Sequence, residues 1–354
     1  MKSIAKRKKS GGRKKKAPAR ATTRRSKKII KARVIRTVRQ MPLLSYEDIL
    51  LRSIIGTEDG HKVAESAALF SSVLSNLSEG MRDLHYKSGM PIGRALYRLY
   101  EKDRKYEWYE ESVHDLVSFL ERAGYKRVTY NVSPGRIEIS IHNKDSMQLG
   151  TNMHGFEAGI MSGFLTAARM RLVHVNEELC CENGSEFCRF VTSDQYEPGS
   201  IDPQIVEKFF GYVNGRVRET GRQRAEDMKI PEEYYLLASL MLMHKDYSSE
   251  IGQIMVSMGR RLAANMKMTR SNIENAMWLL GLGDARITSL KPLRGSISYS
   301  RLRAREEFLG MSIPFLDGLL SGAVGKGSRV EVVAAANANR YNVKLTEKKA
   351  INRR

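Results

Sequence analysis

The chain has 354 residues, a length that favours about two domains, and 42% of them are hydrophobic, as in ordinary folded proteins. No run of about 18 consecutive apolar residues occurs, and no apolar segment follows the N-terminal charges, so neither a membrane span nor a secretory signal is expected. The three cysteines lie within nine residues, unlike the cysteines of a disulfide-stapled secreted protein. We therefore expect a cytoplasmic protein.

The net charge of +21 is concentrated at the N-terminus. Residues 1–40 contain 18 Lys or Arg and no Asp or Glu, which leaves 42 basic against 39 acidic residues in the remainder. Such a segment is predicted to be disordered alone, and to bind nucleic acid by releasing counterions from phosphates. The alternative is a solubilising or targeting tail. The residues expected to contact nucleic acid are Lys6, Arg7, Lys8, Lys9, Arg13, Lys14, Lys15, Lys16, Arg24, Arg25, Lys27 and Lys28.

The rest of the chain contains an internal repeat. The segment GYKRVTY from Gly124 matches GDARITS from Gly283, and GIMSGFL from Gly159 matches GLLSGAV from Gly318, both at an offset of 159 residues. Upstream, Gly93-Arg94 matches Gly259-Arg260 at an offset of 166. Several matches in one order at nearly one offset indicate a duplicated domain.

The first copy reads as helices followed by paired strands, and predicts an α+β fold in which an antiparallel sheet packs against helices. Apolar residues at helical spacing predict helices over 64–77, 91–99, 110–123 and 156–170, and alternation predicts strands over 126–132, 136–142, 171–176 and 188–192. In the last helix Gly159 and Gly163 lie one turn apart, which predicts close backbone packing.

The predicted organisation is therefore a disordered basic tail and two tandem domains. Its boundaries are 1–40 for the tail, 41–195 for the first copy, 196–230 for a linker and helix, 231–346 for a degenerate second copy, and 347–354 for a basic C-terminal end.

A cysteine-rich hairpin in the first copy is the candidate site. Glu177, Cys180 and Cys188 flank a turn at Asn183-Gly184, so the hairpin brings the two thiols together. Thiolates favour zinc in a reducing cell, and a structural site needs about four ligands. His154 is the fourth candidate, with His174 as the fallback on the same strand. Cys181 is expected to point to the opposite face, and is the weaker ligand candidate.

The spacing leaves two alternatives open for this hairpin. The cysteines can be reduced thiols that merely pack in the core, since free cysteine is often buried. A redox pair is the other reading. The second copy has VEVVAAANANRYNVKL at the corresponding place, with neither cysteine nor histidine, and is expected to serve as a packing partner.

The run from His154 to Phe190 resembles the 4-vinyl reductase domain. That family's pattern is a Gly-aromatic-x-x-Gly helix, then Glu-Glu-x-Cys, a glycine in the turn, and Cys-x-Phe; this sequence has HGFEAG, then EELCCENGSEFCRF. The element order from about residue 60 to 193 also fits the family, which is itself similar to subunits of the TRAPP vesicle-tethering complex and to haem-nitric-oxide-binding sensors. The resemblance implies an antiparallel sheet against helices around a hydrophobic pocket, usually in a dimer.

In family members that sense aromatic compounds, a glutamate and cysteines bind zinc beside the pocket, which corresponds here to Glu177, Cys180 and Cys188. A further cysteine ligand of those sensors has no counterpart, and His154 is the candidate for its place. We expect a non-enzymatic, sensor-type protein that binds a small hydrophobic molecule and zinc, with homodimerisation as a further expectation. The alternatives are a scaffold or regulatory subunit and, third, a reductase-type enzyme, for which no catalytic set stands out in the sequence.

Overall fold

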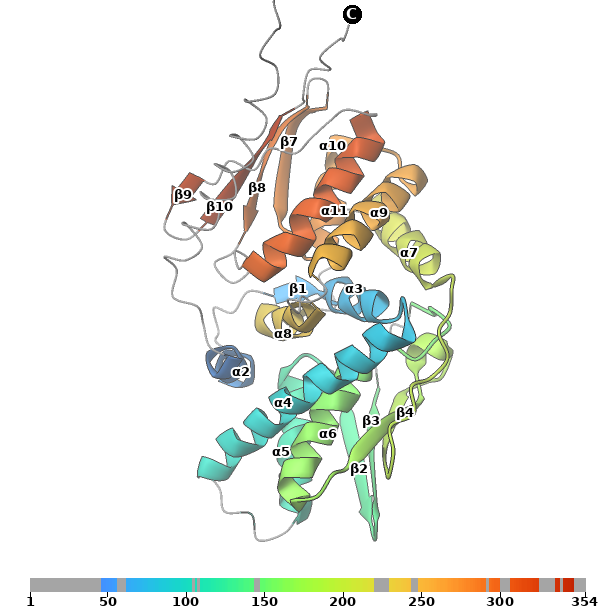
Figure 1. Cartoon of the computed structure of the whole chain (residues 1–354), viewed down its shortest axis with the longest axis vertical. Coiled ribbons are helices and arrows are strands. Elements are labelled where there is room, and N and C mark those ends of the chain that lie inside the picture. The colour runs from blue at the N-terminus through green and yellow to red at the C-terminus, as the bar shows by residue number, and fades with distance from the viewer. Residues whose placement is uncertain are drawn as a thin grey trace, which may run out of the picture.

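The computed structural model describes residues 46–55, 62–103, 106, 109–142, 147–219, 229–242, 248–290, 293–299, 306–324, 335–337 and 340–346. The basic tail with its predicted nucleic-acid contacts and the C-terminal end 347–354 lie outside these residues. The described chain has the predicted α+β fold (Figure 1), with helices packed against antiparallel sheets. None of the described helices has the length and apolar character needed to cross a membrane.

The first copy is built around a four-stranded antiparallel sheet. The sheet order is β2-β3-β5-β4, so the two hairpins are joined through β3 and β5. Its elements in chain order are α2 (Tyr46–Ile55), β1 (Lys62–Ala64), α3 (Glu65–Ser75), α4 (Glu79–Asp103), α5 (Tyr109–Arg122), β2 (Val128–Ser133), β3 (Arg136–Ile141), α6 (Gly155–Arg169), β4 (His174–Leu179), a 3-10 turn (Cys181–Asn183) and β5 (Cys188–Ser193).

The second half of the chain repeats this order element by element. It contains α7 (Ile205–Glu219), β6 (Lys229–Pro231), α8 (Glu232–Leu242), α9 (Ser248–Asn265), α10 (Arg270–Leu279), β7 (Asp284–Leu290), β8 (Leu293–Tyr299), α11 (Glu306–Val324), β9 (Ala335–Asn337) and β10 (Arg340–Thr346). Its sheet order, β7-β8-β10-β9, is that of the first sheet. Helix α7 is the equivalent of α2. The boundaries predicted from the sequence place this helix in the segment 196–230, between the two copies.

Glycines allow the long helices of each copy to touch through their backbones. A Cβ atom on Gly159 of α6 would collide with the carbonyl oxygen of Tyr86 in α4, and one on Gly163 with that of Met90. The close packing predicted for this helix is therefore confirmed. In the second copy, Gly318 of α11 meets the carbonyl of Val256 in α9 in the same way.

The same contacts correct one of the sequence matches. Gly89 of α4 lies against the carbonyl of Phe156, and Gly259 of α9 lies against that of Phe315, which is 159 residues further on. Gly259 is thus the equivalent of Gly89 rather than of Gly93, one helical turn from the match at offset 166. Each helix carries one glycine-arginine pair, and the sequence match aligns these two pairs although they lie one helical turn apart.

The two copies join through their N-terminal elements. Strands β1 and β6 pair antiparallel with Val63 opposite Ile230, and the sequences KVAE and KIPE make these two residues equivalents as well as partners. A local two-fold axis therefore passes through this pair. Figure 1 shows α3 and α8 beside β1, between the two sheets at opposite ends of the molecule. Across this junction Ser71 and Ser239, on α3 and α8, share a buried hydrogen bond of 2.9 Å.

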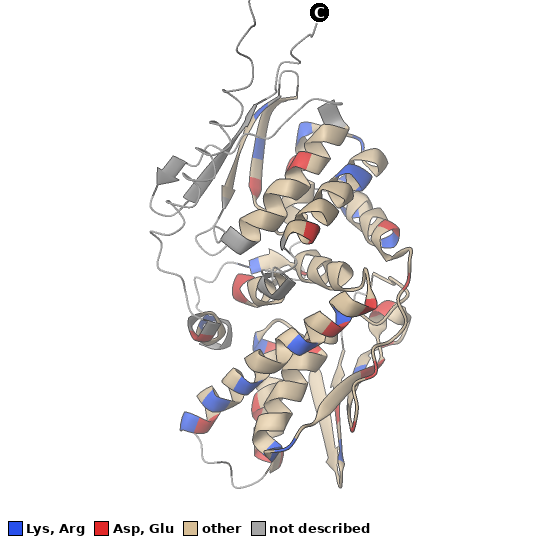
Figure 2. Ribbon diagram, in the orientation of Figure 1, with Lys and Arg blue, Asp and Glu red and all other residues tan. Residues whose placement is uncertain are grey.

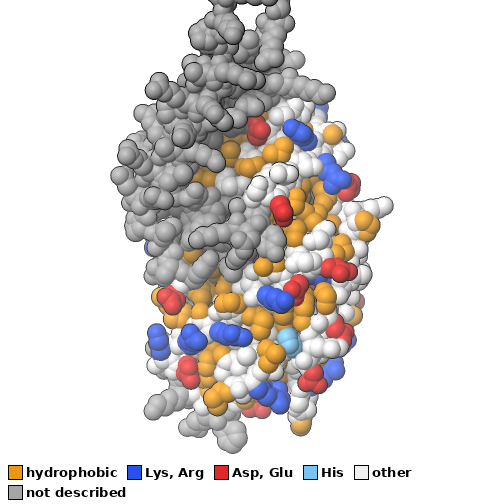
Figure 3. Space-filling view, in the orientation of Figure 1, with side chains coloured by type: hydrophobic (Ala, Val, Ile, Leu, Met, Phe, Trp, Pro, Cys, Tyr) orange, Lys and Arg blue, Asp and Glu red, His pale blue; other side chains and the backbone are white. Residues whose placement is uncertain are grey.

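Charge on the described surface is mixed. Figure 2 shows Lys and Arg interspersed with Asp and Glu on most helices, and on the face in Figure 3 apolar side chains lie scattered among polar ones. On the outer half of α4, Arg94, Arg98 and Lys102 are exposed at four-residue spacing, together with one acidic residue, Glu101. The three basic residues form a basic stripe along one face of that helix.

Candidate metal centre and adjoining cavity

Four side chains of the first copy converge at the N-terminus of α6. His154 directly precedes the helix, Glu177 lies on β4, Cys180 follows the end of β4, and Cys188 begins β5. One ligand atom from each residue lies within 4.8 Å of the others, so the group can hold a metal ion. The sequence named these four residues, and the structure brings all of them together.

His154 and Glu177 are held together by two hydrogen bonds. The backbone N–H of His154 donates to Oε2 of Glu177 over 3.1 Å, and Nδ1 lies 2.7 Å from Oε1. Asn152 Nδ2 donates to the backbone oxygen of Glu177 over 2.6 Å, which fixes the strand beside the start of the helix. Since the N-terminal end of a helix attracts negative charge, this position suits a carboxylate and thiolates.

The hairpin turn places the thiols. Gly184 closes the 3-10 turn with a φ of 88°, a left-handed conformation that favours glycine. Cys180 Sγ lies 3.5 Å from His154 Nδ1, on the side of the metal group. Cys181 lies 3.0 Å from Cys188, sulfur to sulfur, so it does not turn to the opposite face as predicted. The chain leaves the strand after Cys180 and enters the 3-10 turn, which ends the alternation of side chains that the prediction assumed.

Protonation in this group is strongly coupled. Burial by itself lowers the pKa of His154, but Cys188 and Glu177 together raise it well above its ordinary value. Hydrogen bonds from Cys180 and Cys188 lower the pKa of Cys181 to about 2, whereas burial raises that of Cys180 far above its ordinary value. A metal would need His154 neutral and its cysteine ligands ionised, so its binding would displace protons.

The donor set fits a tetrahedral metal better than it fits packing alone. Two thiols, an imidazole and a carboxylate are all buried or half-buried, and core packing gives no reason to place an ionisable histidine and glutamate beside cysteines. Two thiolates on one zinc ion are about 3.8 Å apart at a Zn–S distance of about 2.3 Å. The ligand atoms lie within 4.8 Å of one another, so the widest separation would have to shorten by about 1 Å for one ion to bind all four. No disulfide joins the three cysteines.

The fallback ligand His174 is placed elsewhere. Its Nδ1 lies 3.2 Å from the hydroxyl of Tyr86, and it forms no part of the metal group. His174 is at the start of β4, three residues before Glu177, so its side chain points to the other face of that strand. The alternation of side chains along β4 thus removes His174 as a ligand of the metal group and leaves His154.

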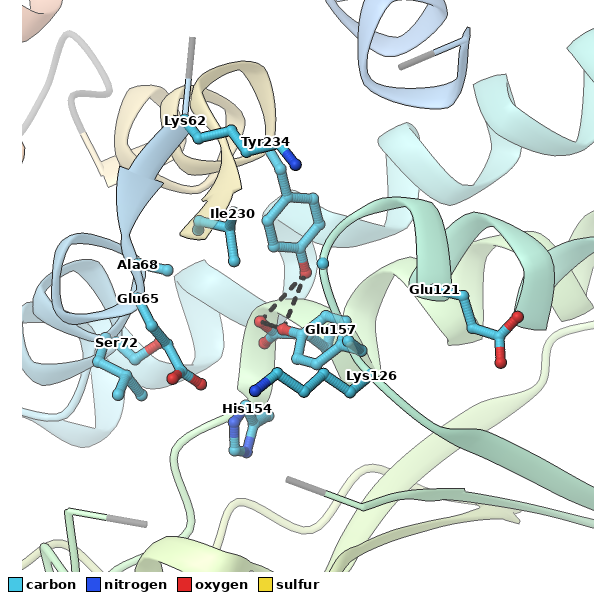
Figure 4. Close-up of a pocket in the computed structure, with 13 residues that line it drawn as sticks. Lys62, Glu65, Ala68, Ser72, Glu121, Lys126, His154, Glu157, Ile230 and Tyr234 are labelled. Carbon is cyan, nitrogen blue, oxygen red and sulfur yellow. Dashed lines mark hydrogen bonds between the residues drawn. The ribbon is translucent and has the colours of Figure 1, made fainter. Parts of the chain in front are cut away.

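A cavity of about 450 Å³ adjoins the metal group and shares His154 with it. Figure 4 shows His154 at one side of this space, with residues of the first copy facing residues of the β1–β6 junction. Lys62, Glu121 and Lys126 are exposed and form its rim, whereas Leu69, Ser72 and Tyr234 are buried. The cavity therefore lies between the two copies.

Glu157 of α6 is the polar centre of this cavity. Its Oε1 accepts hydrogen bonds from the hydroxyls of Tyr125 at 2.5 Å and Tyr234 at 3.1 Å, drawn as dashed lines in Figure 4. Burial, and then the charge of Glu157, raise the pKa of both phenols well above the ordinary value, so both remain protonated donors. Reasoning from sequence missed these three residues. The available signal was an acidic residue in a helix of small and apolar residues.

Comparisons with known proteins identify no function. No family model matches the chain, and no solved structure matches it. An uncharacterized protein of Methanocaldococcus jannaschii is 31% identical over 116 residues, which are 32% of this chain and 64% of that protein. The alignment thus covers less than two thirds of that relative.

Proposed function

We propose that the first copy is a zinc-dependent, small-molecule-binding module of sensor type, and that the chain works in the reducing cytoplasm. The observation that carries this proposal is the position of His154, which belongs to the four-residue metal group and also lines the cavity. A ligand in the cavity would contact a metal ligand directly. Binding of the small molecule and the geometry of the metal centre are then coupled through one imidazole.

Zinc is the metal that this donor set favours. Cysteine and histidine donors select borderline and soft metals over magnesium and calcium, and zinc accepts a carboxylate as well. The four side chains would fill a tetrahedral shell, so the ion would fix structure rather than activate water. His154, Glu177, Cys180 and Cys188 would hold it, and their loss would loosen the hairpin against the start of α6. The likeness of this region to the 4-vinyl reductase domain supports the same assignment.

We further propose that the basic tail brings this module to nucleic acid. The tail carries 18 Lys or Arg without an acidic residue, and the exposed stripe of Arg94, Arg98 and Lys102 offers a second basic surface in the first copy. Phosphate neutralisation by such groups is independent of base sequence and sensitive to salt. DNA and RNA share this chemistry.

The second candidate function is a scaffold, favoured by the second copy. This half repeats the fold but has neither cysteine nor histidine in residues 330–345, and it covers one wall of the cavity through Ile230 and Tyr234. In a scaffold, the duplicated fold would supply only interfaces. Metal content separates this candidate from the sensor.

Native mass spectrometry with metal analysis of the full chain tests the proposal. We expect one zinc per chain, lost in Cys180→Ser and Cys188→Ser but kept in the matched control Cys181→Ser, because Cys181 touches Cys188 but is not one of the four proposed ligands. A protein that remains metal-free after gentle isolation and takes up no added zinc would leave the scaffold as the better reading. Equal zinc loss in all three variants would show that the ligands are assigned wrongly.

A further inference from the structure

The cavity beside the metal group contains a buried carboxylate oxygen with no partner. Glu157 is 5% exposed, its Oε1 accepts from Tyr125 and Tyr234, and its Oε2 has no hydrogen-bond partner among the described residues. Nor does any residue that the structure describes form an ion pair with Glu157. Buried charges are normally paired, because leaving one unpaired costs several kcal/mol. The missing partner therefore lies outside the described residues, and we look for it in the cavity that Glu157 lines.

The second copy shows that the fold does not require this carboxylate. At the offset of 159 residues that relates α6 to α11, Glu157 corresponds to Leu316, which is fully buried. Tyr234 of α8 corresponds, through the pairing of KIPE with KVAE, to Ala67 of α3, also fully buried. The same backbone is thus stable with an apolar pair at these two places. The polar pair in the first copy answers a need other than folding.

Two tyrosine rings line the cavity beside Glu157. The rings of Tyr125 and Tyr234 meet edge to face, with centroids 6.0 Å apart and planes at 89°. A carboxylate set among aromatic rings suits an organic cation, because both the charge and the ring faces attract it. The rim lysines, Lys62 and Lys126, are exposed, so water screens their repulsion of such a ligand.

We propose that this cavity binds a small organic ammonium compound whose N–H group donates to Oε2 of Glu157. This inference rests on the proposed function, because it takes the cavity to be the ligand site of the sensor. A volume of about 450 Å³ accommodates a molecule of small-metabolite size. The ligand class differs from the hydrophobic molecule that the sequence led us to expect, since a neutral apolar compound would leave the Glu157 oxygen unpaired.

The test compares n-butylammonium with n-butanol as probes of the zinc-treated full chain, using calorimetry and thermal unfolding. We expect n-butylammonium to bind more tightly than n-butanol, and Glu157→Gln to weaken its binding about ten- to hundred-fold, as expected for a charge-assisted hydrogen bond. Glu157→Gln keeps an acceptor for the two tyrosines. The control Glu101→Gln, at an exposed position on α4 away from the cavity, should bind the probe as the wild type does.

A second variant guards against misfolding. Glu157→Leu copies the residue of the second copy but removes the acceptor of the Tyr125 and Tyr234 hydroxyls, so it should unfold at a lower temperature than Glu157→Gln. Below that temperature the folded variant should have lost the preference for the ammonium probe. The inference is overturned if n-butylammonium binds no better than n-butanol, or if Glu157→Leu keeps its affinity. Zinc content is measured on the same samples. Ammonium binding without zinc would refute the metal proposal alone, whereas zinc without ammonium binding would refute this inference alone.

Discussion

His85 gives the junction of the two copies a calculable sensitivity to acid. Its ring is buried on α4, stacked on Phe156 with centroids 5.1 Å apart, and burial lowers its pKa from 6.5 to about 3, which the backbone of Ala238 in α8 offsets only in part. Between these two pKa values, the unfolded chain binds a proton that the folded chain refuses. The free energy of unfolding must therefore fall as the pH falls from 6.5, and it stops falling near 3.

The size of this effect follows from the two pKa values. Each pH unit in this interval costs about 1.4 kcal/mol, so the loss from this group reaches about 2 kcal/mol at pH 5. His85→Leu removes the titrating ring at similar volume, and the gap between variant and wild type should widen by that amount between pH 7.5 and pH 5. Urea unfolding at each pH measures it. Parallel curves for the two proteins would refute the reasoning, because other acid-labile groups act equally in both.

Three further outcomes are expected. Gly159→Ala should lower the free energy of unfolding by about 1–3 kcal/mol, because the new methyl group meets the carbonyl of Tyr86. Gly211→Ala, on α7 with open space around it, should raise the free energy of unfolding by up to about 1 kcal/mol. Chemical denaturation of both variants and the wild type measures these changes. Zinc binding should release protons and weaken in acid, since His154 must lose its proton to bind the metal. Calorimetry in buffers of different ionisation enthalpy counts the released protons. A binding heat that does not depend on the buffer would contradict the raised pKa of His154. Deleting residues 1–40 should abolish salt-sensitive binding to duplex DNA or RNA in a filter assay, and undiminished binding by the truncated chain would exclude the tail as the contact.

The sequence predicts local elements of this fold well because periodicity is a local property. The helix expected over 110–123 is Tyr109–Arg122, and the strands expected over 126–132 and 136–142 are Val128–Ser133 and Arg136–Ile141. The spacing of glycines in α6 also predicts its close contact with another helix. Which glycine meets which turn of the neighbouring helix depends on how the two helices pack. The sequence match therefore makes Gly93 the equivalent of Gly259, whereas the contacts make it Gly89.

The candidate site shows the same division. Glu177, Cys180 and Cys188 are neighbours along one hairpin, so their spacing is enough to group them, and His154 joins them through the motif at the start of α6. The partners of Glu157 could not be found in this way. Tyr125 is 32 residues before it and Tyr234 is 77 residues after it, on a helix of the other copy. The contact with Tyr234 depends on how the two copies dock, and the contact with Tyr125 on how the first copy folds; no local pattern encodes either.

Duplication explains how one chain combines these features. In a symmetric dimer of identical subunits, a substitution such as Leu to Glu at the position of Glu157 would place a buried carboxylate at both equivalent positions. Here the copies vary independently, so the first carries Glu157 bonded to Tyr234, while the second has Leu316 and Ala67 at the corresponding positions. The pairing of Val63 with Ile230 preserves the two-fold junction that makes the docking possible. The second half supplies Ile230 and Tyr234 to one wall of the cavity, and the first half can then hold a charged group whose cost a ligand offsets. Leu316→Glu should therefore destabilise the chain more than Glu157→Leu does, because the position that corresponds to Tyr234 is Ala67, which has no hydroxyl to donate.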